Sequence, residues 1–308
     1  MGSMLEQLRS NALIRATISS LRSAIERKQV YRPSNIAKFI FLCGANKAPE
    51  AISERRRALI AFAERNLPHT QFFLAEKMFA ILQKEGHRGN LLDIEHQISL
   101  FSDHVVLVLE SPSAFAELGA FSHNELRKKL IVINDVQYKD APSFINLGPI
   151  KAVQEATGDN GLLLYPMHPD GVTKLDAIGS VYAPLFELLK EPVITRRTPI
   201  APDACNPAKT FDKISAMFLH DVLYMIGPAF HREMIEVMRL IFGDDRYDQV
   251  REHFAILSAI DSVSRREDGL YRTSLSGPYL RYGFDINKVI AAFRISALRN
   301  YPERLYGT

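Results

Sequence analysis

The sequence predicts an α/β protein with a doubly wound parallel sheet, followed by a mostly helical domain. In the first 190 residues or so, short apolar runs rich in Val, Ile, Leu and Phe alternate with segments of helical periodicity. The segment 191–207 then gathers prolines and lacks periodicity, which is typical of a linker. The chain has 308 residues, 47% hydrophobic and 24% charged, a composition that predicts a globular protein long enough for two domains.

The predicted domains are an N-terminal helical arm at 1–33, an α/β domain at 34–190, the linker, and a last domain at 208–308. Met1-Gly-Ser resembles an expression scar ahead of the natural start at Met4. The formal net charge of +3 does not by itself indicate a nucleic-acid binder. Two cysteines far apart in sequence have no metal-ligand spacing, and no apolar run is long enough for a membrane span, so we expect a cytoplasmic protein without a bound metal.

Two helices in the first third of the chain are basic. Residues 4–28 place apolar side chains at helical spacing with arginines between them, which fits either a helix packed on its own domain or a partner-docking arm. The helix predicted at 53–64 carries Arg55, Arg56 and Arg57 in succession. We expect these three arginines to form a solvated face rather than a phosphate clamp.

The first two predicted strands end at residues that could meet a ligand. Residues 37–42 form the first strand and lead into Cys43 and Gly44, where a glycine lets a sugar or phosphate approach the backbone. Residues 71–75 form the second strand, and Glu76 follows directly. Glu76 could face water, hold a ribose hydroxyl or position another catalytic group.

The central stretch is a strand, a tight turn and a helix. The apolar run 104–109 predicts a strand buried on both faces, and the run stops at Glu110. Ser111 is a favourable N-cap and is followed by proline, so a helix starts at once. Glu117 lies almost two turns into that helix among small and apolar neighbours. It either points to water at the edge of the apolar stripe or faces a ligand at the carboxyl end of the strand.

The rest of the α/β pattern has the same alternation. We expect helices at 91–102 and 172–189, and strands at 129–134 and 161–165. The loop 143–149 between the last two strands contains a Gly-Pro turn.

The last domain is predicted to be helical with one hairpin. Helices are expected at 211–226, 231–242, 248–262, near Ser276 and at 287–300, with a tight turn at Asp268-Gly269. Helices followed by a hairpin are typical of a winged helix, a module that binds DNA or docks on proteins. Four arginines on or beside the predicted wing are candidates for phosphate contact: Arg265, Arg266, Arg272 and Arg281.

Several motifs resemble the nucleoside deoxyribosyltransferase-like effector proteins encoded beside retron reverse transcriptases. The similarity extends from about residue 36 to the C-terminus and is most specific in the middle of the chain. It rests on Ile40-Phe-Leu-Cys-Gly, Glu110-Ser-Pro, Glu117-Leu-Gly-Ala-Phe-Ser, Arg127-Lys-Lys-Leu-Ile-Val and Ser143-Phe-Ile-Asn-Leu-Gly-Pro.

The resemblance implies a flavodoxin- or Rossmann-like fold and a site built around Glu117, which occupies the position of the family's nucleophile. A carboxylate can stabilise or trap the oxocarbenium-like state formed when an N-glycosidic bond breaks. Glu110 and Glu76 are the nearest candidates for a general acid. The family more often has glycine and then serine where this chain has Ser113 and Ala114. The implied substrate-binding residues are Cys43, Gly44, Glu76, Glu110, Ser111, Ser113 and Asn146.

The resemblance further implies an anti-phage toxin that depletes a nucleotide pool and needs no cofactor. Because the sequence shows no clear general acid, and a nicotinamide leaving group needs none, we expect NAD to be the substrate and nicotinamide to be released. The resemblance also implies restraint by the reverse transcriptase and its msDNA, an RNA–DNA hybrid, and a homodimer or larger complex. One alternative is an N-glycosidase or deoxyribosyltransferase acting on nucleosides or deoxynucleotides. Another is a non-catalytic winged-helix regulator that binds DNA. A pocket filled by the protein's own side chains would favour this alternative.

Overall fold

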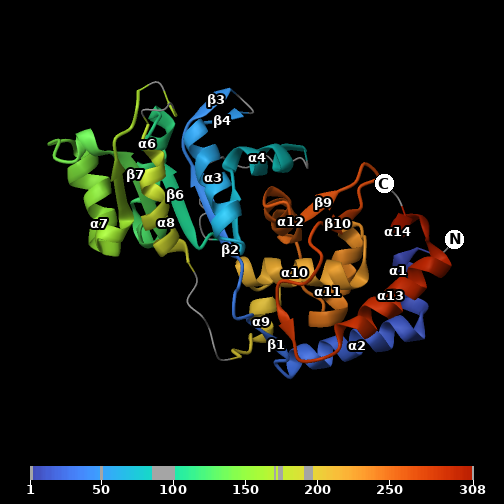
Figure 1. The fold of residues 1–308 in the computed structure, drawn as a ribbon. Helices are drawn as coiled ribbons and strands as arrows, with labels where there is room; N and C mark the ends of the chain where they lie inside the picture. The colour runs from blue at the N-terminus through green and yellow to red at the C-terminus, as the bar shows by residue number, and fades with distance from the viewer. Residues whose placement is uncertain are drawn as a thin grey trace. The chain divides into compact units, whose positions relative to one another are not determined.

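A computed structural model describes residues 3–48, 51–84, 101–169, 171–172, 176–190 and 197–306. The chain forms two compact units (Figure 1). Residues Ala37–Pro192 form what we call the α/β unit, and Met1–Ile36 together with Val193–Thr308 form the terminal unit. No helix in the described ranges is long and apolar enough to cross a membrane.

The α/β unit is built on a five-stranded parallel sheet whose order is β5-β2-β6-β7-β8. The strands are β2 (Lys38–Cys43), β5 (Thr70–Phe73), β6 (His104–Val108), β7 (Leu130–Asp135) and β8 (Leu162–Tyr165). Because the chain adds β5 on one side of β2 and β6 on the other, the direction of winding reverses between β2 and β6. Ligands of open α/β sheets bind at such a point, beyond the carboxyl ends of the strands.

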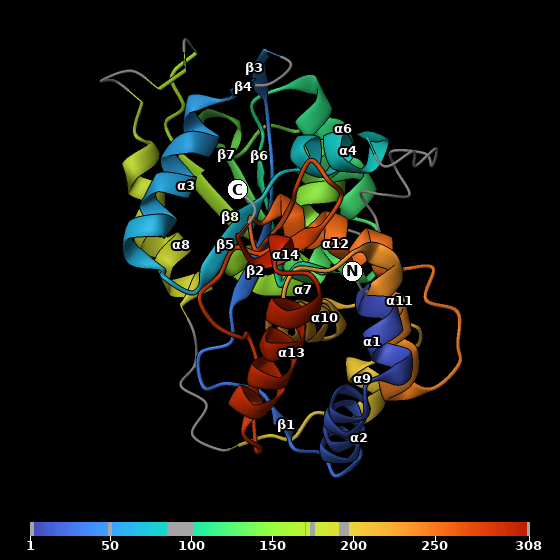
Figure 2. The same ribbon diagram turned by 90° about the vertical axis from the view of Figure 1, so that its right-hand side faces the viewer.

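Helices cover both faces of this sheet, which confirms the doubly wound prediction. One face packs Ile40, Leu42, Val106 and their neighbours against α3 (Glu54–Asn66) and α8 (Tyr182–Leu189). On the other face the ring of Phe121 in α6 (Pro112–Phe121) lies 6.1 Å from the ring of Phe41 in β2. Figure 2 shows α3 and α8 on one side of the strands, and α4 (Ala75–Lys84), α6 and α7 (Lys151–Thr157) on the other.

The predicted strands agree with the observed ones to within a few residues, because uninterrupted apolar runs suit strands buried on both faces. The helix predicted at 172–189 is shorter, since α8 begins at Tyr182 after a 3-10 turn at Ile178–Val181. Most of the helix predicted at 91–102 lies outside the described residues.

The helices α4 and α7 were not predicted, and neither were the two features described next. The first is an antiparallel pair, β3 (Asn46–Ala48) and β4 (Ala51–Ile52). The second is a π-helical turn at Asn146–Ile150 that continues into α7 and includes Pro149. Helical hydrogen bonds begin at the N–H of Leu147, which donates to the carbonyl of Ser143, so Pro149 lies past the first turn. Proline there has no N–H to donate to the residue four positions back, and the wider π-helical turn accommodates that loss. The sequence therefore indicated a loop where a helix begins.

The terminal unit joins the two ends of the chain. Its helices are α1 (Met4–Ser10), α2 (Ala12–Glu26), α9 (Pro202–Cys205), α10 (Lys213–Ile226), α11 (His231–Phe242), α12 (Val250–Ala259), α13 (Ile286–Asn300) and α14 (Glu303–Tyr306). A two-stranded hairpin, β9 (Val263–Arg265) with β10 (Tyr271–Thr273), follows α12. Near the N-terminus, β1 (Val30–Tyr31) pairs with β11 (Arg281–Tyr282). Three helices followed by a hairpin are thus present where the winged helix was predicted.

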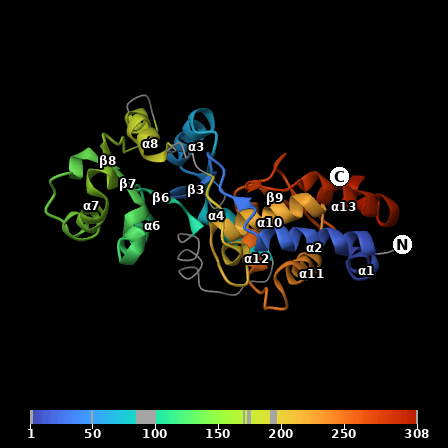
Figure 3. The same cartoon turned by 90° about the horizontal axis from the view of Figure 1, so that it is seen from below.

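The N-terminal helices pack within this unit. α2 lies between α11 and α13 (Figure 3) and buries Ile14, Ile18, Leu21 and Ile25. The structure therefore favours the first of the two interpretations of residues 4–28, a helix packed on its own domain. The segment predicted as a linker also contributes, because Ile200 and Cys205 are buried; residues 191–196 lie outside the described residues.

The helix predicted near Ser276 is wrong. Residues 274–280 are not helical, and the buried carboxylate of Asp221 in α10 accepts hydrogen bonds from the backbone N–H groups of Tyr279 (2.7 Å) and Leu280 (2.9 Å). It also accepts one from the hydroxyl of Tyr282 (2.8 Å). A side chain from a distant helix thus satisfies backbone donors that a local helix would otherwise have used.

Candidate active site at the carboxyl edge of the sheet

The loops after β2 and β6 meet at the point where the winding reverses, and Glu110 joins them. Its Oε1 accepts a hydrogen bond from the backbone N–H of Ala45, 3.2 Å away, and another from the hydroxyl of Ser53, 2.5 Å away. Ser53 is the N-cap of α3. Oε2 of Glu110 accepts a hydrogen bond from Arg55 at 3.0 Å. Glu110 therefore fixes the two strand ends and the start of α3 in one position.

Arg55 extends this network to the loop after β8. Its guanidinium donates to the carboxylate of Asp176 at 2.7 Å and to the carbonyl of His168 at 2.7 Å. The side chains of Arg55, Glu110 and Asp176 are 8%, 5% and 0% exposed. Burial opposes the charge on Arg55, but the hydrogen bonds that it donates to Asp176 and Glu110 outweigh this effect and raise the pKa of Arg55. The network is a buried arginine held between two carboxylates.

Arg56 forms a second pair over the end of β2. The guanidinium is buried and donates to both oxygens of Glu76, at 2.8 and 3.0 Å, and to the carbonyl of Leu42 at 2.9 Å. Burial of Glu76 disfavours its charged form, but the hydrogen bonds and positive charge of Arg56 outweigh this, so the pKa of Glu76 is lowered. Glu76 is thus an ionised carboxylate and is unsuited to act as a general acid.

The predicted solvated face of α3 is therefore wrong for two of its three arginines. Arg55 and Arg56 are buried, and only Arg57 is exposed. A signal for this was available in the sequence. Cations are unfavourable in the first turn of a helix, where the helix dipole is positive. Arg55 and Arg56, the second and third residues after the N-cap Ser53, therefore need carboxylate partners.

Gly44 and Cys43 serve the packing of this edge. Gly44 is buried with φ of +154°, and a Cβ placed on it would lie 3.0 Å from Cδ of Arg56 and 3.1 Å from Oε1 of Glu110. Glycine is required because these two side chains close over the strand end. Cys43, at the last position of β2, is buried and is not part of a disulfide. The described contacts of Gly44 are with protein groups rather than with an open ligand surface.

The charge of Glu76 should make the stability of the protein depend on pH. Because its folded-state pKa is lowered below the ordinary value of 4.5, its contribution is complete above that pH and is lost as the pH falls through the lower folded value. We expect Glu76→Gln to lower the free energy of unfolding by about 1–2 kcal/mol at pH 7, with the difference from the unmodified protein shrinking below pH 4.5. Urea denaturation at several pH values measures this. A difference that stays constant down to pH 3 would contradict it.

α6 carries Glu117 and begins as the sequence indicated. Ser111 is the N-cap, its Oγ accepting from the N–H of Ala114 at 3.3 Å, and Pro112 is the first helical residue. Ser113 is exposed, with its Oγ 2.9 Å from that of Ser111.

Glu117 lies on the stripe of α6 that faces β2. It is one helical turn before Phe121, whose ring contacts Phe41, so it lies about 6 Å closer to the carboxyl edge. Cys43 is two residues beyond Phe41 on the same face of β2, also about 6–7 Å closer to that edge. The side chain of Glu117 is half-buried, with one carboxylate oxygen buried. This places a carboxylate at the level of the last residue of β2.

A cavity of about 580 Å³ opens on the other side of α6. Its walls come from the end of β6, the start of α6, Asn134 of β7 and the loop from Tyr138 to Asn146. Of the predicted ligand residues, Glu110, Ser111 and Asn146 line it, whereas Glu117, Ser113, Cys43, Gly44 and Glu76 do not. The predicted ligand residues are thus divided between two sides of α6.

Asn146 shapes the loop that borders this cavity. Its side-chain amide donates to the backbone carbonyls of Tyr138 at 2.6 Å and Ala141 at 2.8 Å. These bonds close the loop on itself and use the amide hydrogens. Asn146 therefore holds the wall of the cavity in place and also lines it.

The four arginines expected on a wing differ in exposure and in their partners. Arg265 and Arg272 are exposed on the β9–β10 hairpin. Arg266 forms an ion pair with Asp268 at 2.9 Å and donates to a backbone carbonyl in α14. Arg281 lies in β11, 3.5 Å from the hydroxyl of Ser34.

Comparison with known proteins gives consistent matches along the chain. The family model described as "STM3845 retron effector protein" matches residues 51–265. An Escherichia coli protein named "Retron Ec73 putative ribosyltransferase/DNA-binding protein" is 38% identical over 311 residues, covering 98% of each chain. Its Escherichia coli counterpart from retron Ec86, which carries the same description, is 27% identical over 296 residues, covering 92% of this chain and 91% of its own.

Proposed function

The chain belongs to the STM3845 retron effector protein family, and on this premise we propose that its α/β unit is an N-glycosidase in which Glu117 is the nucleophile. The observation that carries this proposal is the half-buried side chain of Glu117 on the helix after the central strand, one helical turn before Phe121, whose ring contacts β2. On a regular helix this position lies toward the carboxyl edge of the sheet, where the winding reverses. The name of the retron Ec73 relative, a ribosyltransferase, describes the same class of chemistry at a sugar C1′ atom.

The reaction proceeds in two displacements. An oxygen of Glu117 attacks C1′ of the ribose, and the bond from C1′ to the base nitrogen breaks with its electron pair leaving on the nitrogen. Water then attacks C1′, loses a proton and releases Glu117. The first step normally needs an acid that protonates the departing base.

The two carboxylates predicted as candidates for this acid are engaged by protein groups. Glu110 accepts hydrogen bonds from Ser53, Ala45 and Arg55, and Glu76 is held in its charged form by Arg56. A nicotinamide leaving group needs no acid, because its ring nitrogen is already cationic and becomes neutral when the bond breaks. We therefore propose NAD as the substrate, with nicotinamide as the first product.

Chromatography of the purified protein incubated with NAD, and separately with deoxynucleosides and deoxynucleotides, tests the substrate. Release of nicotinamide from NAD is the expected result. Release of a nucleobase from the other substrates, with NAD left intact, would support the alternative N-glycosidase or deoxyribosyltransferase. No product from any substrate, with or without the retron reverse transcriptase and msDNA, would favour the non-catalytic regulator.

The same assay tests regulation by the retron components. We propose that the reverse transcriptase and its msDNA restrain the enzyme, and that the exposed Arg265 and Arg272 of the β9–β10 hairpin contact the msDNA phosphates. Adding both components should then lower the rate of nicotinamide release.

We also propose that a second copy of the chain covers the loop beside the 580 Å³ cavity. Four large apolar side chains on this loop and directly beside it are exposed: Phe144 (82%), Leu147 (68%), Val136 and Tyr138. Apolar side chains clustered on a monomer surface indicate an interaction site.

Replacing both Phe144 and Leu147 with serine should shift the protein from dimer to monomer, because the contact loses its largest apolar groups. Light scattering coupled to size-exclusion chromatography measures the mass. Leu13→Ser is the control, since Leu13 is an exposed apolar residue of the terminal unit. An unchanged mass for the Phe144/Leu147 variant, or an unmodified protein that is already monomeric, would rule out this interface.

A further inference from the structure

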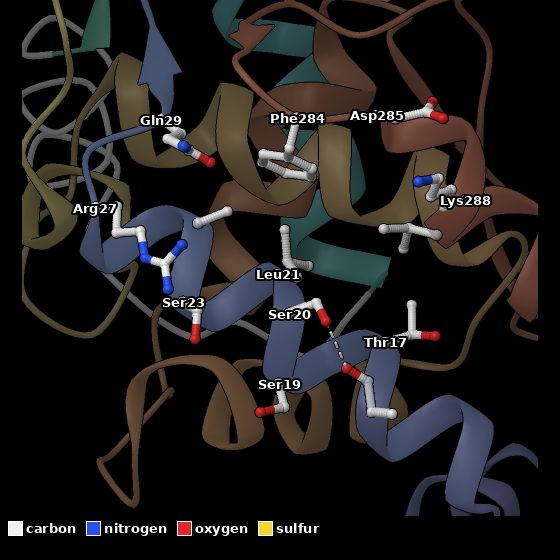
Figure 4. A pocket seen from close by; sticks show the side chains of 13 residues that line it. Thr17, Ser19, Ser20, Leu21, Ser23, Arg27, Gln29, Phe284, Asp285 and Lys288 are labelled. Carbon is white, nitrogen blue, oxygen red and sulfur yellow. Dashed lines mark hydrogen bonds between the residues drawn. The ribbon is translucent and has the colours of Figure 1, made fainter.

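The terminal unit contains a polar groove of about 600 Å³ between α2 and the start of α13 (Figure 4). The wall formed by α2 consists of small residues, with the hydroxyls of Thr17, Ser20 and Ser23 and the methyl groups of Ala16 and Ala24. Small side chains allow a ligand to approach the helix closely. The opposite wall is formed by Phe284, Asp285, Lys288 and Val289.

Two cations stand at opposite ends of this groove, Arg27 and Lys288 (Figure 4). Among the residues that the structure describes, neither has a carboxylate within ion-pair distance. The acid that lines the groove, Asp285, is the N-cap of α13 and accepts from the N–H of Asn287 at 3.0 Å. Both cations are exposed and available to an anionic ligand.

The surrounding helices concentrate positive charge. Residues 12–29 contain four basic side chains and one acidic one, and residues 285–300 contain three basic and one acidic, so these segments carry net charges of +3 and +2. The whole chain carries only +3. The two segments that form the groove therefore hold more positive charge than the protein as a whole, which favours a polyanion.

An aromatic ring completes the site. Phe284 is half-buried and lies above the middle of the groove, between the two cations (Figure 4). The ring of Tyr282 contacts it edge-on at 5.4 Å and holds its orientation. A cationic groove that presents an aromatic face is the usual arrangement for single-stranded nucleic acid, because phosphates pair with the cations and a base stacks on the ring.

We propose that this groove, the α2–α13 groove, binds a single-stranded nucleic-acid segment, with Arg27 and Lys288 on phosphates and Phe284 beneath a base. An acidic protein segment could pair with the cations but has no base to stack on Phe284. The inference goes beyond the proposed enzyme activity, because it makes no use of Glu117 and assigns a surface distinct from the β9–β10 hairpin.

The test is the salt dependence of binding of a fluorescent single-stranded oligothymidine to the full-length protein, followed by anisotropy. Each lost phosphate contact lowers the slope of log K against log salt by about 0.7 for single strands. The Arg27→Ala/Lys288→Ala variant should therefore lower the magnitude of the slope by about 1.4. Phe284→Leu should weaken binding roughly fivefold or more with the slope unchanged, since it removes stacking and no charge.

Arg65→Ala/Lys151→Ala is the matched control, because it removes two exposed cations from the α/β unit. Its slope should equal that of the unmodified protein. An unchanged slope in the Arg27/Lys288 variant would overturn the proposal, as would binding of polyglutamate in place of the oligonucleotide. The Arg27/Lys288 variant should keep the full rate of NAD hydrolysis, so failure of this inference and failure of the proposed enzyme activity are distinguishable.

Discussion

Replacing Glu117 with glutamine is expected to lower the rate of nicotinamide release from NAD by at least about 10³-fold. The amide keeps the size of the side chain but cannot attack C1′ or balance the positive charge that develops there. The rate is measured by chromatographic quantification of nicotinamide under saturating NAD. The substitution should leave the thermal midpoint within a few degrees of that of the unmodified protein, because Glu117 is only half-buried.

Glu125→Gln is the matched control for this experiment. It makes the same chemical change shortly after α6, at a side chain that is 83% exposed and paired with Lys128 on the surface. The control should retain full activity. Equal rates for the Glu117 and Glu125 variants would remove Glu117 from the mechanism, and would leave the α/β unit without a nucleophile among the predicted residues.

Replacing Arg55 with methionine is expected to destabilise the protein by about 3–5 kcal/mol. Methionine has a similar length, but it leaves the buried carboxylates of Glu110 and Asp176 without their cation and the carbonyl of His168 without its donor. Removing one member of a buried ion network costs more than a surface pair because the remaining charges cannot recover their hydration. Urea denaturation followed by circular dichroism measures the loss.

Arg57→Met is the control, two residues along the same helix at an exposed position. It should change the free energy of unfolding by no more than about 0.5 kcal/mol. If the Arg55 and Arg57 variants lose the same stability, the buried network does not hold the carboxyl edge together. The loss of unfolding free energy in Arg55→Lys should fall between the losses in Arg55→Met and Arg57→Met. Lysine keeps the charge but cannot reach both carboxylates as the planar guanidinium does.

Several parts of this structure could be predicted from the sequence because they depend on near neighbours. The strands β2, β6 and β7 are uninterrupted apolar runs, and such runs are buried on both faces of a parallel sheet. The start of α6 follows from Ser111 and Pro112, which satisfy the first turn of a helix within three residues. The position of Glu117 on that helix follows in turn.

The network around Arg55 shows what near neighbours do not encode. Arg55 is separated in sequence by 121 residues from Asp176 and by 55 residues from Glu110, yet it donates hydrogen bonds to both. The distance between such groups is set by how the loops after β2, β6 and β8 converge at one edge of the sheet. The sequence showed arginines near a helix start, where a cation needs a carboxylate partner, but it did not show which carboxylates lie within reach.

The sequence by itself determined the alternation of strands and helices and the place of Glu117 on the helix after the central strand, because periodicity, caps and apolar runs act over a few residues. Only the tertiary structure decided that Arg55 and Arg56 are buried, that Glu110 and Glu76 are engaged by arginines, and that α2 lines a groove with α13. Those outcomes depend on which distant groups the packed helices and loops bring within hydrogen-bond range, and the free energy of each pair is set by its burial.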